Sequence, residues 1–161
     1  MRGAFGRFAG IGLLLAACLG ASPAAAIEDL GGTYAAKLSC KGIAGTLRGK
    51  YKFEAELLIV QVDAGNVLFQ LEGLPRGTGY LLSDAAKPGG GTLEAISCAL
   101  EAGNYQGGAL HADVKTKAGS DTASLKGTLV IYDFTLSAGN LCKLTAKRTS
   151  TTPVKLPACE G

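Results

Sequence analysis

Cysteines are the residues of this chain whose chemistry is easiest to predict. Of the five cysteines, Cys18 lies in an N-terminal segment that resembles an export signal. The other four, Cys40, Cys98, Cys142 and Cys159, are separated by 58, 44 and 17 residues, and the chain has one histidine. A zinc site needs close pairs of cysteine or histidine. An even number of widely spaced cysteines is instead typical of disulfides in an exported protein. The sequence therefore predicts two disulfides, no metal site and no cofactor.

A few polar side chains remain as candidates for acid–base or anion-binding chemistry. They are His111, the pair Glu54 and Glu56, and the cluster Lys143, Lys147 and Arg148. Most of them alternate with apolar residues, so a solvated strand face is the simpler interpretation. The sequence has no phosphate-binding loop, serine-hydrolase elbow, C-x-x-C redox motif or zinc-protease helix. We therefore expect a protein that is not an enzyme.

The first 26 residues resemble an export signal. Arg2 and Arg7 precede an apolar run at residues 11–19, and three alanines at positions 24–26 suit cleavage before Ile27. The apolar run is shorter than the roughly 18 residues that a membrane-spanning helix needs. We therefore expect a signal peptide at residues 1–26 and no transmembrane span.

Cys18 allows a second prediction of where the protein is located. Residues 15–18 read Leu-Ala-Ala-Cys and resemble the bacterial lipobox, in which the cysteine is lipidated and becomes the first residue. Ordinary cleavage predicts a periplasmic or secreted protein, whereas lipidation of Cys18 predicts a lipid-anchored one. The 135 residues from Ile27 onward carry 14 basic and 13 acidic side chains, which argues against a nucleic-acid partner.

Polar and apolar residues alternate along most of the chain after the signal, as in half-buried β-strands. About eight such segments are separated by turns rich in glycine, asparagine and proline, a spacing typical of a sandwich or barrel. We predict an all-β fold, an antiparallel up-and-down barrel of about eight strands over residues 27–148. Residues 149–161 form an extended C-terminal tail held by a disulfide.

One segment breaks the alternation. Lys52, Glu54 and Glu56 occupy even positions, but the polar residues Gln61 and Asp63 that follow occupy odd ones. An inserted residue that shifts the phase of a strand is a β-bulge. The sequence therefore predicts a bulge between residues 57 and 60.

Gly32-Thr33-Tyr34, at the start of the first predicted strand, resembles the G-x-W of the calycins, the superfamily of lipocalins and avidins. Calycin barrels commonly carry an arginine on the last strand that packs over this aromatic ring. Arg148 is in phase with the core residues of the last predicted strand, so the resemblance implies that Arg148 packs over Tyr34. It covers only a few residues at each end and implies no ligand.

The pairing of the four cysteines follows from topology if the barrel closes. Its first and last strands are then neighbours, and Cys40 and Cys142 lie in phase with the core residues of those strands. Cys98 is left to hold Cys159 and the tail, which resembles the tail disulfide of many lipocalins. The alternative that joins Cys142 to Cys159 and Cys40 to Cys98 stays open.

Two functions fit an exported, non-catalytic barrel. An eight-stranded barrel either fills its interior with side chains or leaves room for one ligand. Small inward residues such as Ala36, Ala112 and Ala146 favour a small apolar or amphipathic ligand in the interior. The alternative is a structural or protein-interaction module of the cell envelope with a filled core. The sequence names no protein partner, and the interior volume separates the two functions.

Overall fold

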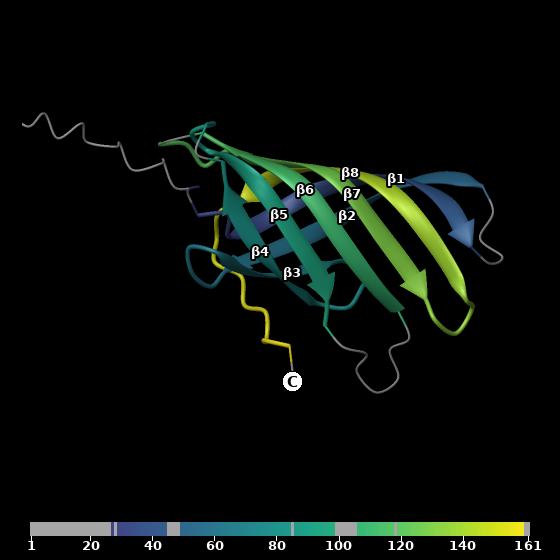
Figure 1. The fold of residues 1–161 in the computed structure, drawn as a ribbon. Helices are drawn as coiled ribbons and strands as arrows, with labels where there is room; N and C mark the ends of the chain where they lie inside the picture. Colours follow the sequence, from purple (N-terminus) through teal and green to yellow (C-terminus); the bar gives the residue numbers. More distant parts are fainter. Residues whose placement is uncertain are drawn as a thin grey trace, which may run out of the picture.

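The computed structural model describes residue 27 and residues 29–44, 49–84, 86–98, 106–117 and 119–159. Eight antiparallel strands, each paired with the next and the last with the first, close into a barrel (Figure 1). The strands are β1 (Gly32–Ala44), β2 (Lys50–Gln61), β3 (Asn66–Leu71), β4 (Gly77–Ser83), β5 (Gly90–Ser97), β6 (Gln106–Thr116), β7 (Ala123–Asp133) and β8 (Ala138–Ser150). The predicted all-β, eight-stranded architecture is confirmed.

The barrel is longer on one side than on the other. β1, β2, β7 and β8 have 11 to 13 residues, whereas β3 and β4 have six and seven. Leu71 at the end of β3 lies opposite Leu57, so residues 50–56 of β2 continue past it. We call the end where β1 begins the proximal end. The projecting ends of β1, β2, β7 and β8 at the other end form the distal lip (Figure 1).

The core consists of the inward-facing side chains, which alternate along each strand with outward-facing ones. Leu38, Leu57, Leu93, Leu125 and Leu144 are all buried. Full burial of a leucine side chain stabilises a fold by about 1.5–3 kcal/mol. The outward positions between them include lysine, serine and threonine on β1, β7 and β8. This alternation is what selects a barrel wall with one wet and one dry face.

The predicted bulge in the second strand is wrong. β2 pairs with β1 and β3 in an unbroken register, and its odd positions face inward from Phe53 to Gln61. Gln61 faces inward because its side-chain oxygen accepts the N–H of Leu30 at 2.8 Å, at the end of the barrel. The polarity of the residues changes there, while the phase of the strand does not. Register shifts occur instead between β1 and β8, at Thr33/Tyr34 and Gly42/Ala44.

Two disulfides tie distant parts of the chain together. Cys40 and Cys142 are cross-strand partners where β1 meets β8, and their bridge spans 102 residues. Cys98, just after β5, is joined to Cys159 in the tail. This is the pairing that the topology argument favoured. β8 continues to Ser150, beyond the expected boundary at 148, because Ser150 pairs with Thr33.

The tail runs outside the barrel from the proximal end of β8 to the distal end of β5, on the side of β3 and β4 (Figure 1). The two disulfides suit an oxidising environment outside the cytoplasm. In the described part of the chain, no helix is long and apolar enough to cross a membrane.

Proteolysis without reduction tests this connectivity. We expect peptide mass mapping to recover Cys40 joined to Cys142 and Cys98 joined to Cys159, because only these pairs are brought together by the closed barrel. A fragment that joins the Cys142 and Cys159 peptides contradicts the closed ring of strands.

Candidate functional site

The barrel interior is the first place where a ligand could bind, and it is filled. The void that the structure describes there is about 10 Å³, between Leu57, Phe69, Leu71, Leu110, Leu129 and Leu144. One water molecule needs at least about 10–15 Å³ of such space, whereas ligand pockets measure about 300–1,000 Å³. The void between these residues is therefore far smaller than a ligand pocket.

Small residues on one wall accommodate large ones from another. Gly77 faces inward on β4, and a Cβ there would collide with the ring of Phe69 and the carbonyl of Ile96. Ala36, Ala112 and Ala146, which the sequence suggested as lining a cavity, are all at most 1% exposed. Alternation of small and large residues is how small barrels fill a tapering interior. The alanines are therefore part of a packed core.

The proximal end of the barrel is closed by the segment that precedes β1. Ile27 and Leu30 are buried, and the hydroxyl of Tyr34 donates a hydrogen bond to the carbonyl of Leu30 at 2.7 Å. The amide of Leu30 is bound by Gln61. Both backbone groups of the buried Leu30 are thus satisfied, as buried backbone must be.

Arg148 holds this closing segment in place. It is the direct cross-strand partner of Tyr34. The contacts of its guanidinium are hydrogen bonds rather than ring stacking: it donates to the carbonyls of Asp29 and Asp121 at 2.7 Å and of Gly31 at 3.3 Å. Arg148 is therefore a structural clamp between β8, the segment before β1 and the β6–β7 connection.

The electrostatics of Tyr34 reflect its burial. Desolvation raises the pKa of Tyr34 from 10.0 to about 12, while the nearby charge of Arg148 opposes the shift. Burial dominates because the ionised phenolate would lose its hydration at the closed end of the barrel. The side chain therefore stays neutral over the physiological range.

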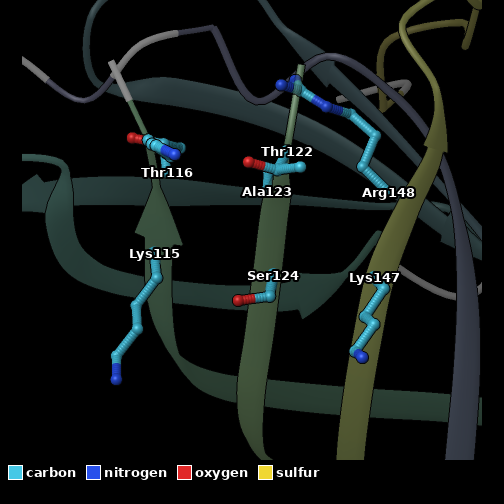
Figure 2. Close-up of a pocket in the computed structure, with 8 residues that line it drawn as sticks. Lys115, Thr116, Thr122, Ala123, Ser124, Lys147 and Arg148 are labelled. Carbon is cyan, nitrogen blue, oxygen red and sulfur yellow. The ribbon is translucent and has the colours of Figure 1, made fainter. Parts of the chain in front are cut away.

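Grooves large enough for a partner lie on the outer wall. The groove shown in Figure 2 has a volume of about 370 Å³ and crosses β6, β7 and β8. Ser124 pairs with Lys115 on one side and Lys147 on the other, which places the two lysine Cα atoms about 10 Å apart. Neither lysine forms an ion pair with a described acidic residue. This basic groove can therefore accept an anionic group.

The structure divides the basic cluster that the sequence suggested. Lys143 and Lys147 project from the outer wall, whereas the guanidinium of Arg148 is used at the proximal end (Figure 2). Lys115, 28 residues before Lys143, was not singled out from the sequence. Its outward position on β6 was readable from alternation, but its proximity to Lys147 depends on the order of strands in the ring.

The acidic candidates are ordinary surface residues. Glu54 forms an ion pair with Lys37 at 2.8 Å, with both side chains largely exposed. The ammonium group of Lys37 holds the pKa of Glu54 below its usual value. The backbone N–H of Glu56 donates to the carboxylate of Glu72 at 3.2 Å. Cys18 lies outside the described residues.

The arrangement closest to a catalytic one is a cross-strand row on the outer wall. His111 contacts Glu94 through Nδ1 and pairs with Thr128 on the next strand, in the order of acid, base and hydroxyl. No hydrogen bond joins Thr128 to His111, and 59% of the His111 side chain and 48% of that of Glu94 are exposed. Nucleophilic catalysis needs that hydrogen bond and a site that excludes water. In the described part of the chain, no cluster of His, Cys, Asp or Glu could hold a metal ion.

Comparison with known proteins adds no family to these observations. No protein-family model matches the chain, and no curated protein is significantly similar to it. The resemblance to calycins therefore stays a prediction.

Ala36→Leu tests whether the core is filled. We expect the free energy of unfolding in urea to fall by about 1–3 kcal/mol, because added methylene groups force a packed core apart. Ala35→Leu on the neighbouring, exposed position is the matched control and changes stability by less than about 0.5 kcal/mol. Unchanged or higher stability of Ala36→Leu would mean that the interior has room.

Tyr34 predicts a loss of stability in alkali. The unfolded tyrosine ionises near pH 10 and the folded one near pH 12, so unfolding becomes easier as pH rises between these values. The pKa difference corresponds to about 2–3 kcal/mol. Tyr34→Phe loses the hydrogen bond to Leu30, about 1 kcal/mol at neutral pH, but escapes this alkaline loss. Denaturation of the unmodified protein and of Tyr34→Phe from pH 9 to 12 measures the difference between their free energies of unfolding. A difference that does not change with pH contradicts the buried phenol.

Proposed function

We propose that this chain is an exported, non-catalytic interaction module of the cell envelope, which binds through its outer wall. The observation that carries the proposal is the small volume of the described interior void. At about 10 Å³, this void is too small for a small-molecule ligand. The outer wall, by contrast, has grooves of about 330–570 Å³. A filled barrel is a rigid scaffold for contacts on its surface.

The exposed His111–Glu94 pair supports the absence of catalysis. Its row offers no water-excluded cavity and no hydrogen-bonded nucleophile. The disulfides and the N-terminal signal pattern support export, with Ile27 as the first residue of the mature chain. Burial of Ile27 against the barrel, where a Cβ on Gly91 would meet its side chain, supports a folded domain that begins there.

The basic groove of Figure 2 is the part of the wall best suited to an acidic protein partner. Lys115 and Lys147 are exposed and form no ion pair with a described acidic residue, and the hydroxyl-bearing Ser124 lies between them. A carboxylate that enters this groove gains two cations and a hydrogen-bond donor.

Native mass spectrometry of protein recovered from its own envelope tests the interior. We expect the mass of the polypeptide with two disulfides and no small-molecule adduct. A reproducible adduct that survives purification would overturn the proposal in favour of an interior ligand.

Cross-linking in the envelope tests the outer wall. We expect Lys115→Glu with Lys147→Glu to abolish a reproducible cross-link to an envelope protein. Lys87→Glu with Lys155→Glu, an equal change of charge at two exposed lysines elsewhere, leaves it intact. Equal loss in both double variants contradicts a specific basic groove.

A further inference from the structure

The distal lip carries apolar side chains that the barrel leaves uncovered. Ile43 lies next to the last residue of β1, Phe134 and Leu136 lie between β7 and β8, and Leu141 begins the outward face of β8. Between 44% and 56% of each is exposed. Ile43 and Tyr132 flank Gly139, and the rings of Tyr132 and Phe134 are in contact at 4.8 Å. The four exposed residues therefore belong to one neighbourhood, on strands that project beyond β3 and β4 (Figure 1).

Lysines border this apolar tip on the same strands. Lys41 pairs with Leu141 on one side and with Lys50 on the other, so two like charges are directly opposite each other. Lys52 and Lys143 follow, one on each side of Ser39. Like charges that face each other across strands destabilise a sheet. None of these four lysines forms an ion pair with a described acidic residue, so a bound anion would offset their repulsion.

The acidic residue described within the lip is already engaged. The carboxylate of Asp133 accepts the backbone N–H of Leu136 at 3.0 Å and the side-chain amide of Gln106 at 3.4 Å. Asp133 therefore shapes the turn that presents Phe134 and Leu136. Among the described residues of the lip, these four lysines outnumber Asp133, so their combined charge is positive.

The order of these groups along the strands matches the depth profile of a membrane surface. Leu141 and its partner Lys41 lie three residues from Ala138, the first residue of β8, or about 10 Å along the strand. An interfacial protein buries its apolar groups about 5–10 Å into the boundary of headgroups and acyl chains. Lys41 and Lys50 are set back by this distance and Lys52 and Lys143 by two residues more, and their flexible stems extend toward the phosphate level.

We propose that the distal lip docks this protein on an anionic lipid surface, with Phe134 and Leu136 inserted and Lys41, Lys50, Lys52 and Lys143 on the headgroup phosphates. The inference rests on the proposed function in one respect, that binding is carried by the outside of the barrel. A lipid surface suits the lip better than a second copy, because two lips would bring their lysines together.

Vesicle sedimentation tests the docking. The probe is a vesicle of phosphatidylglycerol and phosphatidylethanolamine, compared with one of phosphatidylcholine, and the protein carries Cys18→Ala so that it cannot be acylated. We expect binding to the anionic vesicle only, weakened by salt. Each lip lysine contributes about fivefold in partitioning, so Lys41→Gln with Lys50→Gln lowers the partition coefficient about 25-fold.

Two control variants separate the lip from general charge and hydrophobicity. Lys87→Gln with Lys155→Gln removes the same charge from exposed positions outside the lip and lowers partitioning by no more than about twofold, because screening limits distant charges. Phe134→Ser with Leu136→Ser lowers partitioning at least about tenfold. Tyr80→Ser with Leu82→Ser, equally exposed on β4, leaves it unchanged.

Several outcomes would overturn the assignment: no binding to either vesicle, equal binding to both, or equal losses in lip and control variants. A lip-dependent dimer in analytical ultracentrifugation without lipid would assign the lip to a second copy. Lip-dependent binding of an acidic peptide, with no binding to vesicles, would assign the lip to a protein partner. Each of these results leaves the bare native mass of a filled barrel unchanged. Failure of the docking is therefore distinguishable from failure of the proposed function.

Discussion

Pairing of β1 with β8 is the interaction on which the rest of the structure depends. It joins residues that are 95 to 117 positions apart, so it forms against a large loop-closure entropy. The Cys40–Cys142 bridge lies in this pairing and removes part of that entropy from the unfolded chain, about 4–5 kcal/mol in the chain-entropy model. Tyr34 and Arg148 are partners in the same pairing, so closure of the wall also closes the proximal end. Without it, the inward leucines would face water and the lip would divide between β1 and β8.

The closed wall determines where function can lie. Phe69 packs where Gly77 has no side chain, and the buried alanines leave no cavity of ligand size. We therefore place the proposed binding on the outside of a barrel whose core is packed and whose proximal end is clamped. Unequal strand lengths then divide that outside into a basic groove near the proximal end and an amphiphilic lip at the distal end.

The alternation of polar and apolar residues along single strands was enough to predict the fold, because a barrel wall has one solvent-exposed face and one buried face. It also placed His111 outside and put Arg148 in phase with the core residues of the last strand. Alternation failed at Gln61, where a polar side chain faces inward to bind the amide of Leu30 at the barrel end. It could not predict the interior volume, since whether an alanine lines a void depends on what reaches it from the opposite wall. Neither the basic groove nor the distal lip could be predicted from the sequence. The approach of Lys115 to Lys147, or of Lys41 to Lys50, is decided by strand order and register.

The central claim is that the barrel is closed and filled, and native-state hydrogen exchange tests it most directly. The account predicts that the β1 amides between Ala36 and Cys40, and those of their partners on β8, exchange only through global unfolding, as slowly as amides between β6 and β7. Amides of the short pair β3 and β4 exchange no more slowly than these. Fast exchange of β1 and β8 by local opening, with β3 and β4 better protected, would contradict a closed ring and favour an open sandwich.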